Sequence, residues 1–244
     1  MSPPSFVLEK GLVKRLYDPL VRDARDRFAG RPAIASMLSP DTNPAALERC
    51  LLAFCAYGIT MTDCVESWIR RAADRCIELG LEDLGHALHA HAAREAGHHL
   101  MLIADTRKLV ERWNRRHQPE LDVDKVLALE LPIGVLQYRE LHERTIEGEE
   151  PYCQLAIGYE IDQLSARFGP VFLKNCRRLL GDEILPALSF VEKRIELDIS
   201  HTVFHRQQLE ALLGCNPRYA RSLARAGSDA LAAYAAFIEN CWDA

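Results

Sequence analysis

The apolar residues of this chain recur at helical spacing along most of its length, and no stretch alternates as a strand does. Neither a sustained period-two pattern nor an Asn-Gly or Asp-Gly turn between apolar runs is present, and these are the usual signals of strands and hairpins. The 244 residues, 48% of them hydrophobic, suffice for one buried core. The sequence therefore predicts a single all-α domain over residues 1–244, a compact bundle of about seven helices.

Proline and glycine residues divide the chain into helical segments. The three prolines near residues 31–43 predict a loop, and Gly169-Pro170 predicts the end of a helix. The expected segments are 5–29, 45–79, 81–117, 121–129, 132–146, 151–169, 171–180, 182–213 and a terminal helix over 216–242.

Composition narrows the classes of partner. A net charge of -5 without a long basic tract gives no reason to expect nucleic acid or an anionic membrane surface. The N-terminus lacks the layout of a signal peptide, and no apolar run approaches the ~18 residues of a membrane span. Because the eight cysteines are scattered, they indicate buried reduced thiols rather than a disulfide framework. We expect a cytoplasmic protein.

The stretch from His86 to Trp113 contains the pattern His91-x-x-x-Glu95-x-x-His98. Ala, Leu, Arg and Glu favour helix here, and no proline interrupts it. At about 100° per residue, the three side chains lie within roughly 60° of each other on one helix face. In bundle-type di-iron proteins a Glu-x-x-His on an inward face supplies two ligands. Since histidine-rich helix faces are usually solvated, the pattern predicts a metal site only if other helices supply partners.

A second carboxylate–imidazole pair, Asp198-x-x-His201, lies in the expected helix 182–213, with His205 one turn further on. Its neighbours are largely apolar, which indicates a buried helix. Carboxylates are rare in a core unless they are paired or bind metal. A surface aspartate is the alternative interpretation of Asp198 taken alone.

Two further segments carry a carboxylate in an apolar setting: Glu66, or Asp63 three residues before it, and Glu160. Each alone is weak evidence. Together, four helices offer the set that carboxylate di-iron bundles use, in which two helices give a Glu and two give a carboxylate-x-x-His. Imidazole and carboxylate ligands suit iron or manganese, and the scattered thiols argue against structural zinc.

The sequence has no Gly-rich phosphate loop, nucleophile elbow or dinucleotide fingerprint. Electrons for a redox reaction would therefore come from the substrate or from an external donor.

Three stretches within residues 45–215 resemble the haem-oxygenase-like iron-containing redox enzymes, also called haem-oxygenase-like di-metal oxidases. They are HAHAAREAGHHLMLIADTRKL, LHERTIEGEEPYCQLAIGYEID and LSFVEKRIELDISHTVFHRQQLEALL. The resemblance implies a seven-helix bundle that activates O₂ at two Fe(II) ions. It also implies oxidation of a small amino-acid-, amine- or fatty-acid-like substrate, often in a biosynthetic pathway.

Carried over by position, the resemblance implies six catalytic metal ligands: Glu66, Glu95, His98, Glu160, Asp198 and His201. His91 occupies a place where some members have another ligand. Many members have a histidine four residues before the aspartate of the final helix, where this chain has Arg194. Arginine stays protonated and cannot ligate a metal. Three explanations of Arg194 at this position are open. Either His91 or His205 replaces the missing ligand, or the second iron binds weakly, or metal has been lost and Arg194 binds a substrate carboxylate.

Two other functions stay open. One is a cofactor-free bundle enzyme of the thiaminase or quinone-synthase type, which works by acid–base chemistry in the same cavity. The other is a metal-free binding protein that kept the bundle. For the enzyme we expect a small-molecule substrate, and a homodimer is the default for such folds.

Overall fold

The computed structural model describes residues 11–244, which are mostly helical and contain no strand. The predicted all-α bundle is confirmed. These residues form eleven α-helices: α1 (Asp18–Ala29), α2 (Pro32–Leu38), α3 (Pro44–Thr62), α4 (Val65–Glu78), α5 (Glu82–Glu95), α6 (His98–Asn114), α7 (Val123–Leu127), α8 (Ile133–Glu147), α9 (Gln154–Leu180), α10 (Ser189–Cys215) and α11 (Ala220–Asp243). Short π- or 3-10-helical turns are η1 (Val13–Tyr17), η2 (Pro151–Cys153), η3 (Asp182–Ala187) and η4 (Pro217–Tyr219).

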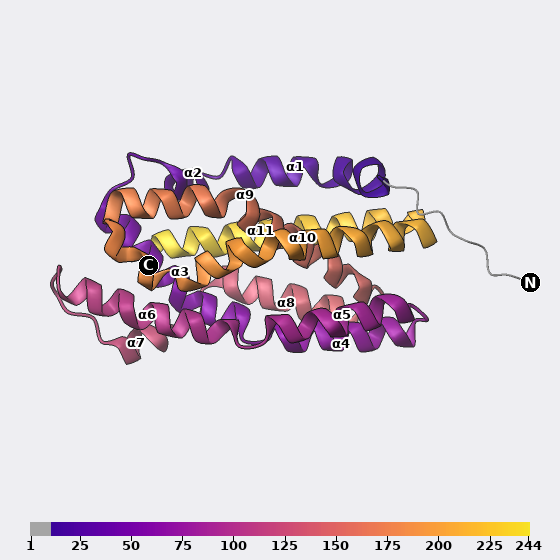
Figure 1. Cartoon of the computed structure of the whole chain (residues 1–244), viewed down its shortest axis with the longest axis horizontal. Coiled ribbons are helices and arrows are strands. Elements are labelled where there is room, and N and C mark those ends of the chain that lie inside the picture. Colours follow the sequence, from indigo (N-terminus) through magenta and orange to yellow (C-terminus); the bar gives the residue numbers. More distant parts are fainter. Residues whose placement is uncertain (1–10) are drawn as a thin grey trace, which may run out of the picture.

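Most of the long helices run along the long axis of an elongated bundle, with α11 near its middle (Figure 1). The alanine-rich α11 contacts α1, α3, α8 and α9. Small side chains allow this close approach: a Cβ added at Gly134 of α8 would lie 2.5 Å from the backbone nitrogen of Phe237. The lack of a side chain at Gly134 therefore lets α8 approach the backbone of α11 closely.

Two helices expected to be continuous are each split in two. The segment 81–117 breaks between α5 and α6 at Gly97, whose φ of 79° lies in the left-handed region that glycine favours. The segment 45–79 breaks at Asp63 and Cys64. These breaks explain why the structure has more helices than the sequence indicates.

Other segment boundaries also differ from expectation. α9 continues through Pro170, which lies exposed where a missing backbone hydrogen bond costs least. The expected loop 31–43 contains α2, and the expected helix 182–213 opens with η3 before α10 begins. Of the expected helix 5–29, residues 5–10 lie outside the described residues, and the remainder forms η1 and α1.

The buried apolar residues form two clusters, and a polar cavity lies between them. The cavity is lined by Met61 and Tyr138 of one cluster and by Ile69 and Leu88 of the other. Charged and imidazole side chains from α5, α9 and α10 also face it. The bundle therefore encloses its ionisable groups in a low-dielectric interior, where each one needs a partner.

One helical stretch among residues 11–244, Pro44–Glu78, is long and apolar enough to cross a membrane. In its most apolar window 67% of the residues are buried inside the bundle, as in a core helix.

Burial of His142 should make the protein less stable in acid. Its ring stacks on Trp68 with centroids 4.1 Å apart, and Nδ1 lies 3.0 Å from Gln154 Oε1. Burial lowers the pKa of His142 from 6.5 to about 4. As the pH falls below 6.5, the unfolded chain binds a proton at His142, whereas the folded protein binds it only near pH 4. The folded protein therefore loses stability as the pH falls from about 6.5 to about 4.

Urea unfolding of the wild type and of His142→Gln tests this effect. Between about pH 7 and 5 the wild type should lose about 2 kcal/mol more stability than the variant. The variant's lost stacking lowers its stability at every pH, so only the pH dependence of the difference matters. Parallel pH profiles for the two proteins would contradict the prediction.

Candidate metal centre

Four helical segments bring ionisable side chains to the polar cavity or into contact with the side chains that line it. Arg194, Asp198, His201 and His205 are spaced by four, three and four residues, so they form one stripe along α10. α5 ends with His91 and Glu95, α6 begins with His98, and α9 adds Asp162. Except for His98 and Arg194, which are partly exposed, these residues are buried.

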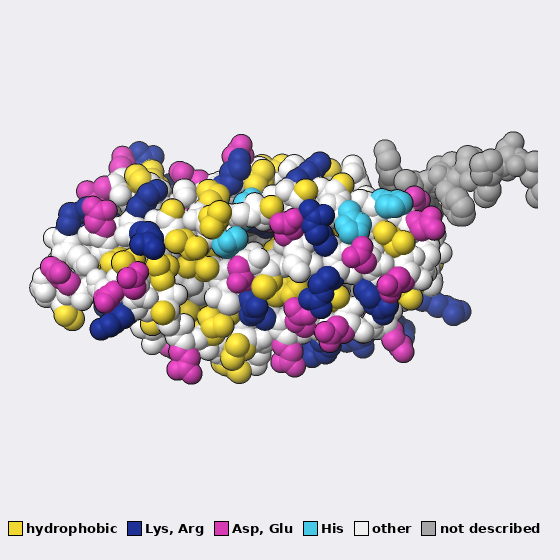
Figure 2. All heavy atoms as spheres, turned by 90° about the horizontal axis from the view of Figure 1, so that it is seen from below, with side chains coloured by type: hydrophobic (Ala, Val, Ile, Leu, Met, Phe, Trp, Pro, Cys, Tyr) yellow, Lys and Arg dark blue, Asp and Glu magenta, His cyan; other side chains and the backbone are white. Residues whose placement is uncertain are grey.

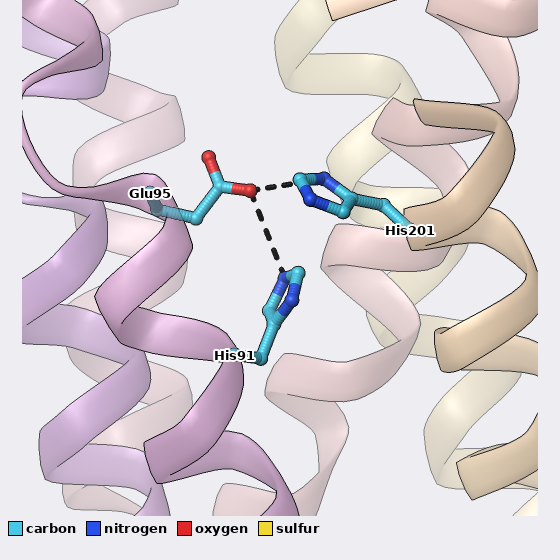
Figure 3. A group of neighbouring side chains, drawn as sticks. All are labelled: His91, Glu95 and His201. Carbon is cyan, nitrogen blue, oxygen red and sulfur yellow. Dashed lines mark ion pairs between the residues drawn. The ribbon is translucent and has the colours of Figure 1, made fainter. Parts of the chain in front are cut away.

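His91, Glu95 and His201 form the most compact group (Figure 3). Glu95 Oε1 lies 3.7 Å from His91 Nε2 and 3.1 Å from His201 Nδ1. One ligand atom from each residue lies within 4.8 Å of the others. The three side chains are 3%, 6% and 1% exposed. Two imidazoles and one carboxylate thus converge on a single point inside the bundle.

The other carboxylate oxygen of Glu95 is held from two sides. Glu95 Oε2 lies 3.0 Å from His98 Nδ1 and accepts a hydrogen bond of 2.9 Å from Arg194 Nη1. The sequence pattern predicted that Glu95 and His98 share one helix, but they lie on two helices, α5 and α6. They meet because the left-handed turn at Gly97 places the end of α5 beside the start of α6. Glu95 therefore keeps only Oε1 directed at the histidines of the group.

Arg194 links the second group of ligand-type side chains, which consists of Asp162, Asp198 and His201. Its Nη2 donates to Asp162 Oδ1 at 2.6 Å and lies 3.1 Å from Asp198 Oδ1. His201 Nδ1 lies 3.5 Å from Asp198 Oδ1. His201 therefore belongs to both groups, and Arg194 contacts carboxylates of both.

Several buried atoms of the site lack a partner with hydrogen-bond geometry. His201 Nδ1 and both carboxylate oxygens of Asp198 are among them. Asp162 Oδ2 and His205 Nδ1 are 2.8 Å apart, but they too are misaligned for a hydrogen bond. Such orphaned atoms are uncommon in native interiors, and an absent ion is one established reason for them. Of these atoms, His201 Nδ1 also belongs to the first group, so the donor set of His91, Glu95 and His201 has an unpartnered nitrogen that fits a divalent metal ion.

Burial and charge shift the ionisation of Glu95 and its partners. Burial alone would raise the pKa of Glu95, but contacts with His201 and His98 and the charge of Arg194 hold it well below its usual value. Burial opposes protonation of His201, yet its contacts with Asp198 and Glu95 raise its pKa to about 9. The carboxylate of Glu95 is thus ionised at neutral pH, as a metal ligand must be, whereas His201 has to release its proton when a metal ion binds.

The pKa values of the other ionisable side chains of the site also follow from burial and from neighbouring charges. Burial, together with the nearby His205, lowers the pKa of His91 to about 3, so this imidazole is neutral and can ligate. Burial also opposes ionisation of Asp162, but the charge of Arg194 and the contact with His205 lower its pKa. Burial raises the pKa of Asp198.

Two residues expected as ligands are not brought to this group. Glu66 is 36% exposed on α4 and forms an ion pair of 2.7 Å with Arg70. Glu160 is buried on the opposite side of α9, where it accepts hydrogen bonds of 2.9 Å from Tyr17 Oη and 2.8 Å from Arg25 Nε. The other five expected residues do gather here: His91, Glu95, His98, Asp198 and His201.

Asp162, which the sequence analysis did not single out, takes the place expected of Glu160. Two residues further along α9 correspond to a rotation of about 200°, which turns Asp162 toward α10. Gly158, one turn earlier, leaves the space that His205 fills: a Cβ there would lie 2.9 Å from His205 Nε2. The pairing of a small residue with Asp162 one turn later is the sequence signal that could have identified this face.

Two cavities of about 100 Å³ each adjoin the site. The polar one contains His91, Glu95, His98 and Asp162. The other is lined almost wholly by apolar side chains and shares Arg194, Ile161, Phe190 and Tyr234 with the first. Figure 2 shows a hollow beside histidine side chains near the middle of the face on the side of α4, α5 and α6. A polar cavity thus borders an apolar chamber.

Removing the charge of Glu95 should abolish tight metal binding. Glu95→Gln keeps the shape of the side chain but replaces an anionic ligand, so Fe(II) or Mn(II) should bind at least about 100-fold more weakly. Glu66→Gln is the matched control, because Glu66 lies at the surface. Equilibrium dialysis under anaerobic conditions measures both affinities, and thermal melts verify folding. Equal loss of affinity in the two variants would contradict this assignment.

No family model matches the sequence, and no curated protein matches it. Solved structures do resemble the chain. One is a domain of unknown function with a heme oxygenase-like fold from Shewanella denitrificans OS217, with a TM-score of 0.75 and 15% identity over 95% of this chain and 92% of that one. Another is a TenA homolog from Pseudomonas syringae pv. tomato str. DC3000, with a TM-score of 0.73 and 10% identity over 100% of this chain and 98% of that one. The chain thus has a haem oxygenase-like fold.

Proposed function

We propose that this protein is a non-haem iron enzyme that uses O₂ to oxidise a small substrate carrying an apolar portion. The observation that carries the proposal is the buried group of His91, Glu95 and His201 beside an apolar chamber. Two histidines and one carboxylate with open positions are the ligand set of mononuclear non-haem Fe(II) oxygenases. Bound there, iron would supply O₂ activation and one-electron chemistry.

The side chains around the group are suited to fixing these ligands. His98 and Arg194 hold Glu95 Oε2, which leaves Oε1 directed at His91 and His201. Contacts of this kind from outside the ligand set fix orientation and tune metal affinity. Their role in the proposed enzyme is to prevent Glu95 from turning away between turnovers.

The apolar chamber supports the proposed class of substrate. Phe28, Phe54, Phe168 and Phe172 are among its walls, and Arg194 lies at its border with the polar cavity. The guanidinium already contacts three carboxylates, so it has little capacity to bind a substrate carboxylate as well. We therefore assign substrate binding mainly to apolar contacts, which also exclude water from the reacting carbon.

A cofactor-free enzyme of the thiaminase type is the second candidate, because one structure of similar fold is a TenA homolog. Thiol nucleophiles receive no support from the cavities. All eight cysteines lie within residues 11–244, and none lines either cavity. A cofactor-free enzyme at this site would therefore use the buried carboxylates and imidazoles as general acids and bases.

A search for substrate-dependent O₂ uptake separates the two candidates. Fe(II)-loaded protein is mixed with a small-molecule extract, and mass spectrometry identifies compounds that disappear. We expect consumption of a compound with an apolar portion to require both iron and O₂, to fall at least about 100-fold in His201→Ala, and to persist in Glu66→Gln. Equal consumption after chelation and without O₂ would favour the cofactor-free enzyme and contradict the proposal.

A further inference from the structure

We propose that the centre holds one divalent ion, and that the guanidinium of Arg194 takes the place and the charge of a second. This inference rests on the proposed function only in assuming that metal binds at all. It departs from the two-iron site that the sequence resemblance implies. The residues of this chain fit one ion next to a built-in organic cation.

The first step is the position of Arg194. Its Nη2 lies 2.6 Å from Asp162 Oδ1 and 3.1 Å from Asp198 Oδ1. These two carboxylates are what the second ligand group offers besides His201. A metal ion bound to the same oxygens would stand in contact with the guanidinium, which never loses its charge. Arg194 therefore excludes a cation from this position.

The second step is that Arg194 cannot move aside easily. Its side chain is 14% exposed, and Nη1 also donates to Glu95 Oε2 at 2.9 Å. The guanidinium thus links α5, α9 and α10 at once. Displacing it would leave a buried arginine and a buried Asp162 without their partners, which is costlier than exchanging surface ions.

The third step is the charge of the enclosed group. Glu95, Asp162 and Asp198, when ionised, carry three negative charges, and Arg194 returns one positive charge, which leaves two negative charges. One divalent ion neutralises this remainder. Two divalent ions would leave two positive charges inside the bundle. Buried charge without compensation is strongly unfavourable, so the charges fit one ion.

The geometry leaves one place for that ion. His91 Nε2 and His201 Nδ1 converge on Glu95 Oε1, whereas Arg194 contacts the other oxygen, Oε2. Asp198 lies 3.5 Å from His201 Nδ1 and is the nearest additional carboxylate on α10. One oxygen of Glu95 thus serves the ion, and the other serves the arginine.

Metal stoichiometry tests the inference independently of activity. Purified metal-free protein is dialysed anaerobically against excess Mn(II), and bound metal per chain is measured by elemental analysis. The wild type and Arg194→Lys, which keeps the charge, should each bind one ion. Arg194→His removes the fixed charge and adds a ligand, so its content should rise to two ions per chain. The Mn(II) resonance spectrum should change from that of an isolated ion to that of a coupled pair.

Each outcome bears on a separate claim. Two ions in the wild type would overturn this inference but leave the proposed metal-dependent function standing. No ion in the wild type would overturn both. One ion in the wild type together with one ion in folded Arg194→His would show that Arg194 does not take the place of a second metal. A wild-type count of zero or two overturns the inference even where Arg194→His fails to fold, and a count of one makes the folded variant the deciding measurement.

Discussion

The contact between the Arg194 guanidinium and three buried carboxylates organises the interior of this protein. Acidic groups on α5, α9 and α10 could not be enclosed together without a cation, and Arg194 supplies one that is part of the chain. Removing one partner of such a buried pair typically destabilises a protein by roughly 3–5 kcal/mol. The same contact fixes one oxygen of Glu95, so the arrangement that stabilises the bundle also orients the proposed ligand.

Most of the helical architecture around this contact could be predicted from the sequence. Helical periodicity and the absence of strand signals predicted the all-α bundle, because these patterns reflect burial along each helix. The positions at which helices end or continue could not be predicted as well. Gly97 ends a helix only because its left-handed backbone joins α5 to α6, while Pro170 fails to end α9. Tertiary packing decides both, and a local pattern does not contain it.

The site was predictable in part for a related reason. His91, Glu95, Asp198 and His201 came together because their spacing on single helices restricts their direction. Because α9 is buried on several sides, its sequence does not indicate which of its carboxylates faces the site. Glu160 was therefore expected at the position that Asp162 occupies. The identity of Arg194 carried real information, since an arginine among expected ligands cannot be one. Its three-way contact required the relative positions of α5, α9 and α10, which spacing along the chain does not give.

A metal centre inside this bundle would combine two imidazoles, a carboxylate whose other oxygen Arg194 holds, and an adjacent apolar chamber. Its most direct test is the anomalous scattering of crystals grown anaerobically with Fe(II). The account predicts one strong anomalous peak within bonding distance of His91, Glu95 and His201, with Arg194 still in contact with Asp162. A map without a peak at these side chains, or with a peak between Asp162 and Asp198 and the arginine displaced, would contradict it.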